Sequence, residues 1–83
     1  MITKEKAIEN AENFIKKRFI DSEWEIVVDI NRIVDTEDAW FVDYQSKKFI
    51  ETKNPAYFVV IRSLIRVDKD SGECILQSDI GND

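Results

Sequence analysis

The side chains in this sequence that could do chemistry are mainly carboxylates, because 17 of its 83 residues are aspartate or glutamate. Asp35, Glu37 and Asp38 lie close together, a spacing that could place a general acid beside a general base. Acid–base catalysis also needs a pocket that moves the two pKa values apart. Nothing in the sequence predicts such a pocket, so we expect no enzymatic activity.

Metal and nucleophile chemistry is restricted by composition. The chain has no histidine and one cysteine, Cys74, which argues against Ser-His or Cys-His nucleophile pairs and against cysteine-rich zinc sites. Asp68, Asp70 and Gly72 are spaced like part of a calcium loop, but the third acidic ligand and the closing glutamate are missing. We therefore expect no metal, no cofactor, a hairpin turn at 68–72 and an unreactive thiol at Cys74.

The charge of the chain is unevenly distributed around its net value of −5. Residues 21–45 carry eight carboxylates and one basic side chain, whereas residues 46–66 carry five basic side chains and one carboxylate. An acidic chain is poorly suited to nucleic acid, because phosphate binding depends on lysine and arginine. The segment 21–45 is either a well-solvated surface or a surface that attracts a basic protein partner.

The first element that positions these residues is a helix at about residues 4–19. Apolar residues recur there at three- and four-residue spacing, and Thr3 is suited to cap its N-terminus. Basic residues occupy the last turn, as the helix dipole favours. The apolar stripe is expected to face the core.

Alternating periodicity follows and predicts an antiparallel hairpin. A strand at 24–34, a polar turn at 35–38 and a second strand at 40–45 account for the pattern. The side chains expected to point inward from the first strand are Trp24, Ile26, Val28 and Ile30.

In the second strand, Trp40 and Tyr44 are expected to point inward and Phe41 outward. Trp40 either anchors the core against the helix or, with the neighbouring acidic turn, belongs to a recognition patch, since aromatic residues are enriched at binding hot spots.

The second half of the chain predicts two further strands. Residues 46–56 form a longer connection, and Asn54 and Pro55 mark its end. Residues 57–67 predict one long strand with its odd-numbered side chains inward and a bend near Ser63. After the turn at 68–72 the last strand follows at 73–77, and residues 78–83 are expected to be a frayed tail.

The order α-β-β-β-β predicts a single α+β domain over residues 1–83, a two-layer sandwich in which the N-terminal helix packs on one face of a four-stranded antiparallel sheet. The other face should be partly solvated, yet it carries an apolar surplus that is either a second small core under the 46–56 connection or a docking surface. By parity, the residues of this surplus are Phe41, Phe58, Val60 and Leu64.

Several short motifs resemble a bacterial family: the strand that begins Trp40-Phe41, the pair Asn54-Pro55 and the hairpin Val67-Asp68-Lys69-Asp70-Ser71-Gly72. Over about residues 2–77 the sequence resembles the immunity protein 35 family, also called YrhB-like domains. The resemblance implies a small cytoplasmic α+β protein that neutralises a cognate toxin by stoichiometric binding. The motif positions are Trp40, Tyr44, Asn54, Pro55, Asp68 and Gly72.

Contacts with the toxin are expected from the acidic turn and the neighbouring strands, namely from Asp29, Asp35, Glu37, Asp38, Phe41 and Asp43. The alternative hypothesis is a heat-stable, chaperone-like or housekeeping protein that holds unfolded clients on the second sheet face. No apolar run reaches the length of a signal peptide or a membrane span, so we expect a cytoplasmic protein without membrane association. A monomer or a weak edge-to-edge homodimer is expected.

Overall fold

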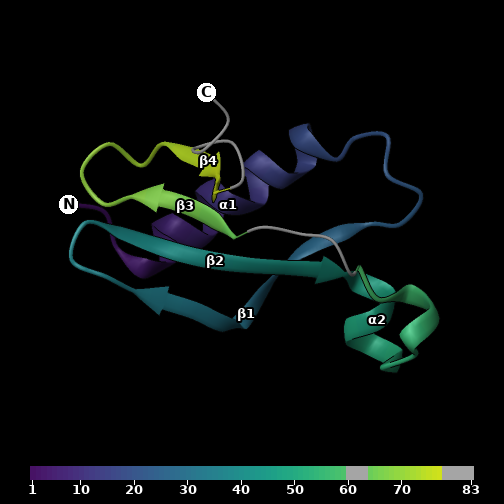
Figure 1. Cartoon of the computed structure of the whole chain (residues 1–83). Helices are drawn as coiled ribbons and strands as arrows, with labels where there is room; N and C mark the ends of the chain where they lie inside the picture. The colour runs from purple at the N-terminus through teal and green to yellow at the C-terminus, as the bar shows by residue number, and fades with distance from the viewer. Residues whose placement is uncertain (60–63, 78–83) are drawn as a thin grey trace.

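The computed structural model, which describes residues 1–59 and 64–77, has a helix layer on a sheet layer (Figure 1). Its main helix is α1 (Lys4–Arg18). The sheet has the order β1 (Ile26–Asp35), β2 (Ala39–Ser46), β3 (Ile65–Asp68) and β4 (Cys74–Leu76), and every neighbouring pair is antiparallel. This arrangement confirms the predicted α+β architecture.

Helix α1 begins and ends close to the predicted residues. The Thr3 hydroxyl accepts a hydrogen bond from the backbone N–H of Lys6 at 3.1 Å, which satisfies one of the unpaired donors at the helix N-terminus. Basic side chains fill the last turn, where they interact favourably with the helix dipole. Ala7, Ala11 and Ile15 form the buried stripe, and the two alanines allow the helix to approach the sheet closely.

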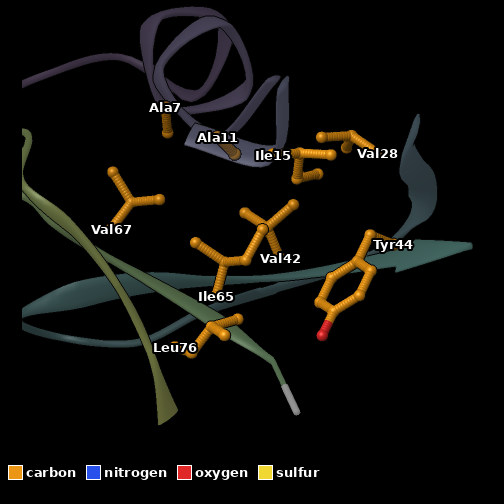
Figure 2. Close-up of a cluster of buried hydrophobic side chains, with 9 residues drawn as sticks. All are labelled: Ala7, Ala11, Ile15, Val28, Val42, Tyr44, Ile65, Val67 and Leu76. Atoms are coloured by element: carbon orange, nitrogen blue, oxygen red, sulfur yellow. The ribbon is translucent and has the colours of Figure 1, made fainter. Parts of the chain in front are cut away.

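The core lies between α1 and the sheet (Figure 2). Val42, Ile65 and Val67 are completely buried beneath the helix. Full burial of an aliphatic side chain of this size contributes about 1.5–3 kcal/mol. The Tyr44 ring closes one end of the core by packing against Phe19, with 5.3 Å between ring centroids.

The strand register assigns each side chain to one of the two sheet faces, because directly opposed residues in an antiparallel pair point the same way. Val42 lies opposite Ile33 and Ile65, and Ile65 lies opposite Leu76, which makes one inward row across all four strands. Trp40 and Val67 belong to the next inward row. The predicted inward orientations of Trp40, Tyr44, Ile65 and Val67 are therefore confirmed.

Two residues of the first predicted strand were assigned wrongly. Asp29 and Ile33 are four positions apart in β1, but their partners Asp43 and Val42 are adjacent in β2. The extra residues of β1 form a β-bulge, which reverses the inward–outward alternation along this strand. Ile30 lies in this bulge and is 63% exposed, and Ile33 takes the inward position instead. Trp24 precedes the strand and packs edge-to-face on Tyr57.

The connection after β2 contains two short helices that were not predicted, α2 (Lys47–Thr52) and a 3₁₀ helix (Pro55–Tyr57). The Ser46 hydroxyl caps α2 by accepting from the N–H of Phe49, and Lys53 ends it in the left-handed conformation. The Asn54 side chain caps the 3₁₀ helix by accepting from the N–H of Ala56. Elements this short are specified by their caps and carry almost no periodicity.

The predicted strand at 57–67 is correct only at its end. Tyr57 belongs to the 3₁₀ helix, residues 58, 59 and 64 are outside any strand, and β3 begins at Ile65. The expected bend near Ser63, the outward Val60 and the frayed tail at 78–83 lie outside the described residues. β4 lies within the strand predicted at 73–77.

Candidate functional site

We call the sheet face that points away from α1 the outer face. One row of side chains, the outer row, crosses all four strands on this face. Val34 lies opposite Phe41, Phe41 opposite Arg66, and Arg66 opposite Ile75. Val34 is 54% exposed and Ile75 42% exposed, so both ends of this outer row are open to solvent. Phe41 is half-buried between them. The outer row is therefore an apolar band interrupted by one arginine.

Acidic residues flank the outer row on both sides. On one side Asp29 lies directly opposite Asp43, and Arg32 from the bulge lies 3.9 Å from a carboxylate oxygen of each. Asp43 is buried, whereas Arg32 is mostly exposed. On the other side Asp68 lies 3.5 Å from a guanidinium nitrogen of Arg66. Both arginines thus contact carboxylates within the face itself.

The two hairpin turns lie side by side at one end of the molecule, beside the N-terminus (Figure 1). The N–H of Lys69 donates to the carbonyl oxygen of Asp38 at 3.0 Å, and the N–H of Ile2 donates to the carbonyl oxygen of Lys69 at 2.8 Å. The turn at 36–38 is closed by hydrogen bonds between Thr36 and Ala39. This packing brings the acidic residues of positions 35–38 next to Asp68 and its turn.

At this end of the molecule, Asp35 lies on the sheet face that α1 covers, opposite Trp40. Its carboxylate forms an ion pair with the ammonium of Lys69, whose side chain is only 12% exposed. The same ammonium lies 4.7 Å from the centroid of the Trp40 ring. The indole N–H of Trp40 is buried and has no hydrogen-bond acceptor among the described residues. Trp40 packs against the core and lies on the face opposite Phe41.

The motif residues of the second hairpin shape its turn. Asp68 accepts hydrogen bonds from the N–H groups of Ser71 and Asp70, and these bonds hold the pKa of its carboxyl below the usual value of 3.8. Gly72 has φ +78°, a left-handed conformation that side chains rarely adopt. Its carbonyl oxygen accepts from the Asn10 side chain on α1 at 3.1 Å.

The surface pockets, the metal-ligating residue types and the one cysteine give weaker candidates for a functional site than the outer face does. A surface pocket of about 270 Å³ lies between the segment before β1 and α2, with Trp24, Lys47 and Lys48 in its lining. Within residues 1–59 and 64–77, no three histidine, cysteine, aspartate or glutamate side chains are grouped as metal ligands. Burial raises the pKa of the Cys74 thiol, which disfavours the reactive thiolate.

The predicted contact residues divide into three groups. Asp29, Phe41 and Asp43 lie on the outer face; Glu37 and Asp38 are exposed at the hairpin turn; Asp35 is paired with Lys69 on the helix side. Sequence reasoning missed the outer row as a unit. Alternation predicted that Phe41 and Arg66 point outward, but only the register shows that Val34 and Ile75 join them in one row.

Comparisons of the chain with protein-family models, curated proteins and solved structures give no match. In the part of the chain that the structure describes, no helix is long and apolar enough to cross a membrane.

Proposed function

We propose that this protein is a bacterial immunity protein of the immunity protein 35 (YrhB-like) type, which neutralises a cognate toxin by stoichiometric binding in the cytoplasm. The observation that carries the proposal is the outer row, where Val34, Phe41 and Ile75 offer apolar surface between acidic flanks. The resemblance of the Trp40, Asn54 and Asp68 motifs to that family supports the same assignment.

The proposed mode of action is occlusion. A protein partner that covers the outer face removes exposed apolar side chains from water, which is the main favourable term in protein association. The acidic side chains around them select against acidic partners and speed the encounter with basic ones. This mode of action requires a rigid surface and no chemistry by the immunity protein itself.

The test is coexpression with the protein encoded beside this chain in its native genome. We expect that neighbour to arrest growth when it is expressed alone, and growth to be restored when this chain is present. The two proteins should then elute together with equal stoichiometry in size-exclusion chromatography. A neighbour that is harmless alone, or that stays toxic in the presence of this chain, would contradict the proposal.

A second candidate function, a chaperone-like holdase, is favoured by the exposure of Val34 and Ile75 on the outer face and of Ile30 in the bulge of β1. A holdase suppresses the thermal aggregation of unrelated client proteins at equal mass. Suppression of this kind without any stoichiometric partner would favour this function over toxin neutralisation.

A further inference from the structure

We infer that the outer row is the docking surface and that its occupant is a basic protein surface, with lysine or arginine side chains arranged around exposed apolar ones. This inference rests on the proposed function, because it names the face and the partner chemistry through which toxin binding would occur.

The apolar part of the argument is the exposure of the outer row. Val34 and Ile75 sit at the two ends of a row that spans the full width of the sheet, with Phe41 beside Val34. Both end residues are about half exposed, although β-branched side chains of this kind are usually buried. A partner that covers the row would bury Val34, Phe41 and Ile75 together.

The second part of the argument is charge. Arg66 and Arg32 already contact carboxylates of the face, so neither presents an uncompensated positive charge to a partner. Glu37 and Asp38 are exposed at the end of the sheet that the outer row adjoins. The chain as a whole carries a net charge of −5. A basic partner is attracted by this arrangement, and an acidic one is repelled.

The same charge argues against a second copy of this chain as the occupant. Two copies in contact would each carry a net charge of −5, and like charges repel each other across an interface. We therefore expect the chain to stay monomeric when its concentration is raised. A dimer that is disrupted by Val34→Lys would overturn the inference.

The experiment uses the whole chain and does not require the toxin. Two short peptides serve as probes, one with alternating lysine and leucine and one with alternating glutamate and leucine, and binding is followed by backbone amide NMR shifts. We expect the lysine peptide to shift amides on β1–β4 around the outer row, and the glutamate peptide to bind at least about tenfold more weakly. The affinity of the lysine peptide should fall as salt is added.

Matched variants locate the contact. Val34→Ser and Ile75→Ser should each weaken the lysine peptide by about fivefold, which is the effect of losing one half-buried aliphatic contact. Ile20→Ser is the control, because Ile20 is 77% exposed but lies outside the sheet, and it should leave the affinity unchanged. Val34→Lys gives a second variant that blocks the row with charge, and thermal unfolding verifies that each variant is folded.

The inference is overturned if the shifts fall on α1 or around Trp24, if both peptides bind equally, or if Ile20→Ser weakens binding as much as Val34→Ser. These outcomes differ from a failure of the proposed function. A harmless neighbouring gene product would remove the toxin assignment but leave the peptide results intact, whereas a toxin bound elsewhere would leave neutralisation intact and remove this face.

Discussion

The ammonium of Lys69 lies over the ring of Trp40, 4.7 Å from its centroid, although the two residues come from different hairpins. The same ammonium pairs with Asp35, the strand neighbour that lies opposite Trp40. One side chain thus covers an aromatic ring, neutralises a carboxylate and joins the two turns at the acidic end of the molecule.

Replacement of Lys69 should therefore destabilise the fold. Lys69→Ala removes the cation–π contact and the apolar stem that covers Trp40, and we expect a loss of about 1–2 kcal/mol in the free energy of unfolding. Lys69→Met keeps the stem and should recover about half of this loss. Urea unfolding measured by tryptophan fluorescence gives both values, and equal stability of wild type and Lys69→Ala would contradict the role of this contact.

A side chain at position 72 should destabilise the fold. Its φ of +78° is strained for alanine, and an added Cβ would approach the Asn10 amide nitrogen to 2.8 Å. Gly72→Ala should cost about 1–2 kcal/mol, the sum of the backbone strain and a displaced Asn10. In the double variant Asn10→Ala with Gly72→Ala, the cost added by Gly72→Ala should shrink to the backbone strain alone. Thermal unfolding of the four proteins forms the cycle that tests this.

Arg32 should stabilise the bulge of β1 by reducing the repulsion between the carboxylates of Asp29 and Asp43. Asp29 and Asp43 are directly opposed, and Arg32 lies 3.9 Å from both. Arg32→Gln should lower the free energy of unfolding by about 0.5–1 kcal/mol. The double variant Arg32→Gln with Asp29→Asn should lose less, and a larger loss in the double variant would show that charge repulsion is not the cause. Chemical denaturation at low salt makes the difference easiest to measure.

Asp68 should make part of the stability pH-dependent. Its pKa is lower in the folded chain than the usual 3.8, because the N–H groups of Ser71 and Asp70 bond to the charged carboxylate. The unfolded chain therefore binds this proton more readily, so the contribution is complete above about pH 3.8 and is lost as the pH falls through the lower, folded pKa. Asp68→Asn should lower the Tm at neutral pH, and its Tm should approach that of wild type in acid. A Tm difference between Asp68→Asn and wild type that stays the same at every pH would contradict this role of the Asp68 carboxylate.

Glu37 and Asp38 should act on association more than on folding. Both are exposed, and neither shares the ion pair that Asp35 forms with Lys69. Glu37→Gln combined with Asp38→Asn should slow association with the proposed toxin and flatten its salt dependence. Glu12→Gln combined with Asp21→Asn removes the same charge far from the outer row and should change the rate less. Stopped-flow association kinetics at several salt concentrations compare the two double variants. An association rate that Glu37→Gln with Asp38→Asn leaves unchanged would contradict a role of this turn in binding.

Local patterns of the sequence were enough to predict α1 with its Thr3 cap, the hairpin of β1 and β2, and the inward faces of Trp40 and Tyr44. These features depend on residues close together in the chain, where side-chain periodicity and capping groups act directly on the backbone. Alternation failed at Ile30 because a bulge adds residues to one strand without marking the sequence. It failed at Tyr57 because Asn54 and Pro55 start a 3₁₀ helix there.

Local sequence patterns predict α1 and the hairpin of β1 and β2, and the composition shows an acidic chain that contains no histidine. Only the folded chain shows that Val34, Phe41, Arg66 and Ile75 form one row and that Lys69 reaches Asp35 and Trp40. Cross-strand register and contacts between hairpins join residues that are distant in the sequence: 25 positions separate Phe41 from Arg66, and 34 separate Asp35 from Lys69. Such contacts follow from how the strands pack side by side under α1, and no local pattern in the chain encodes them.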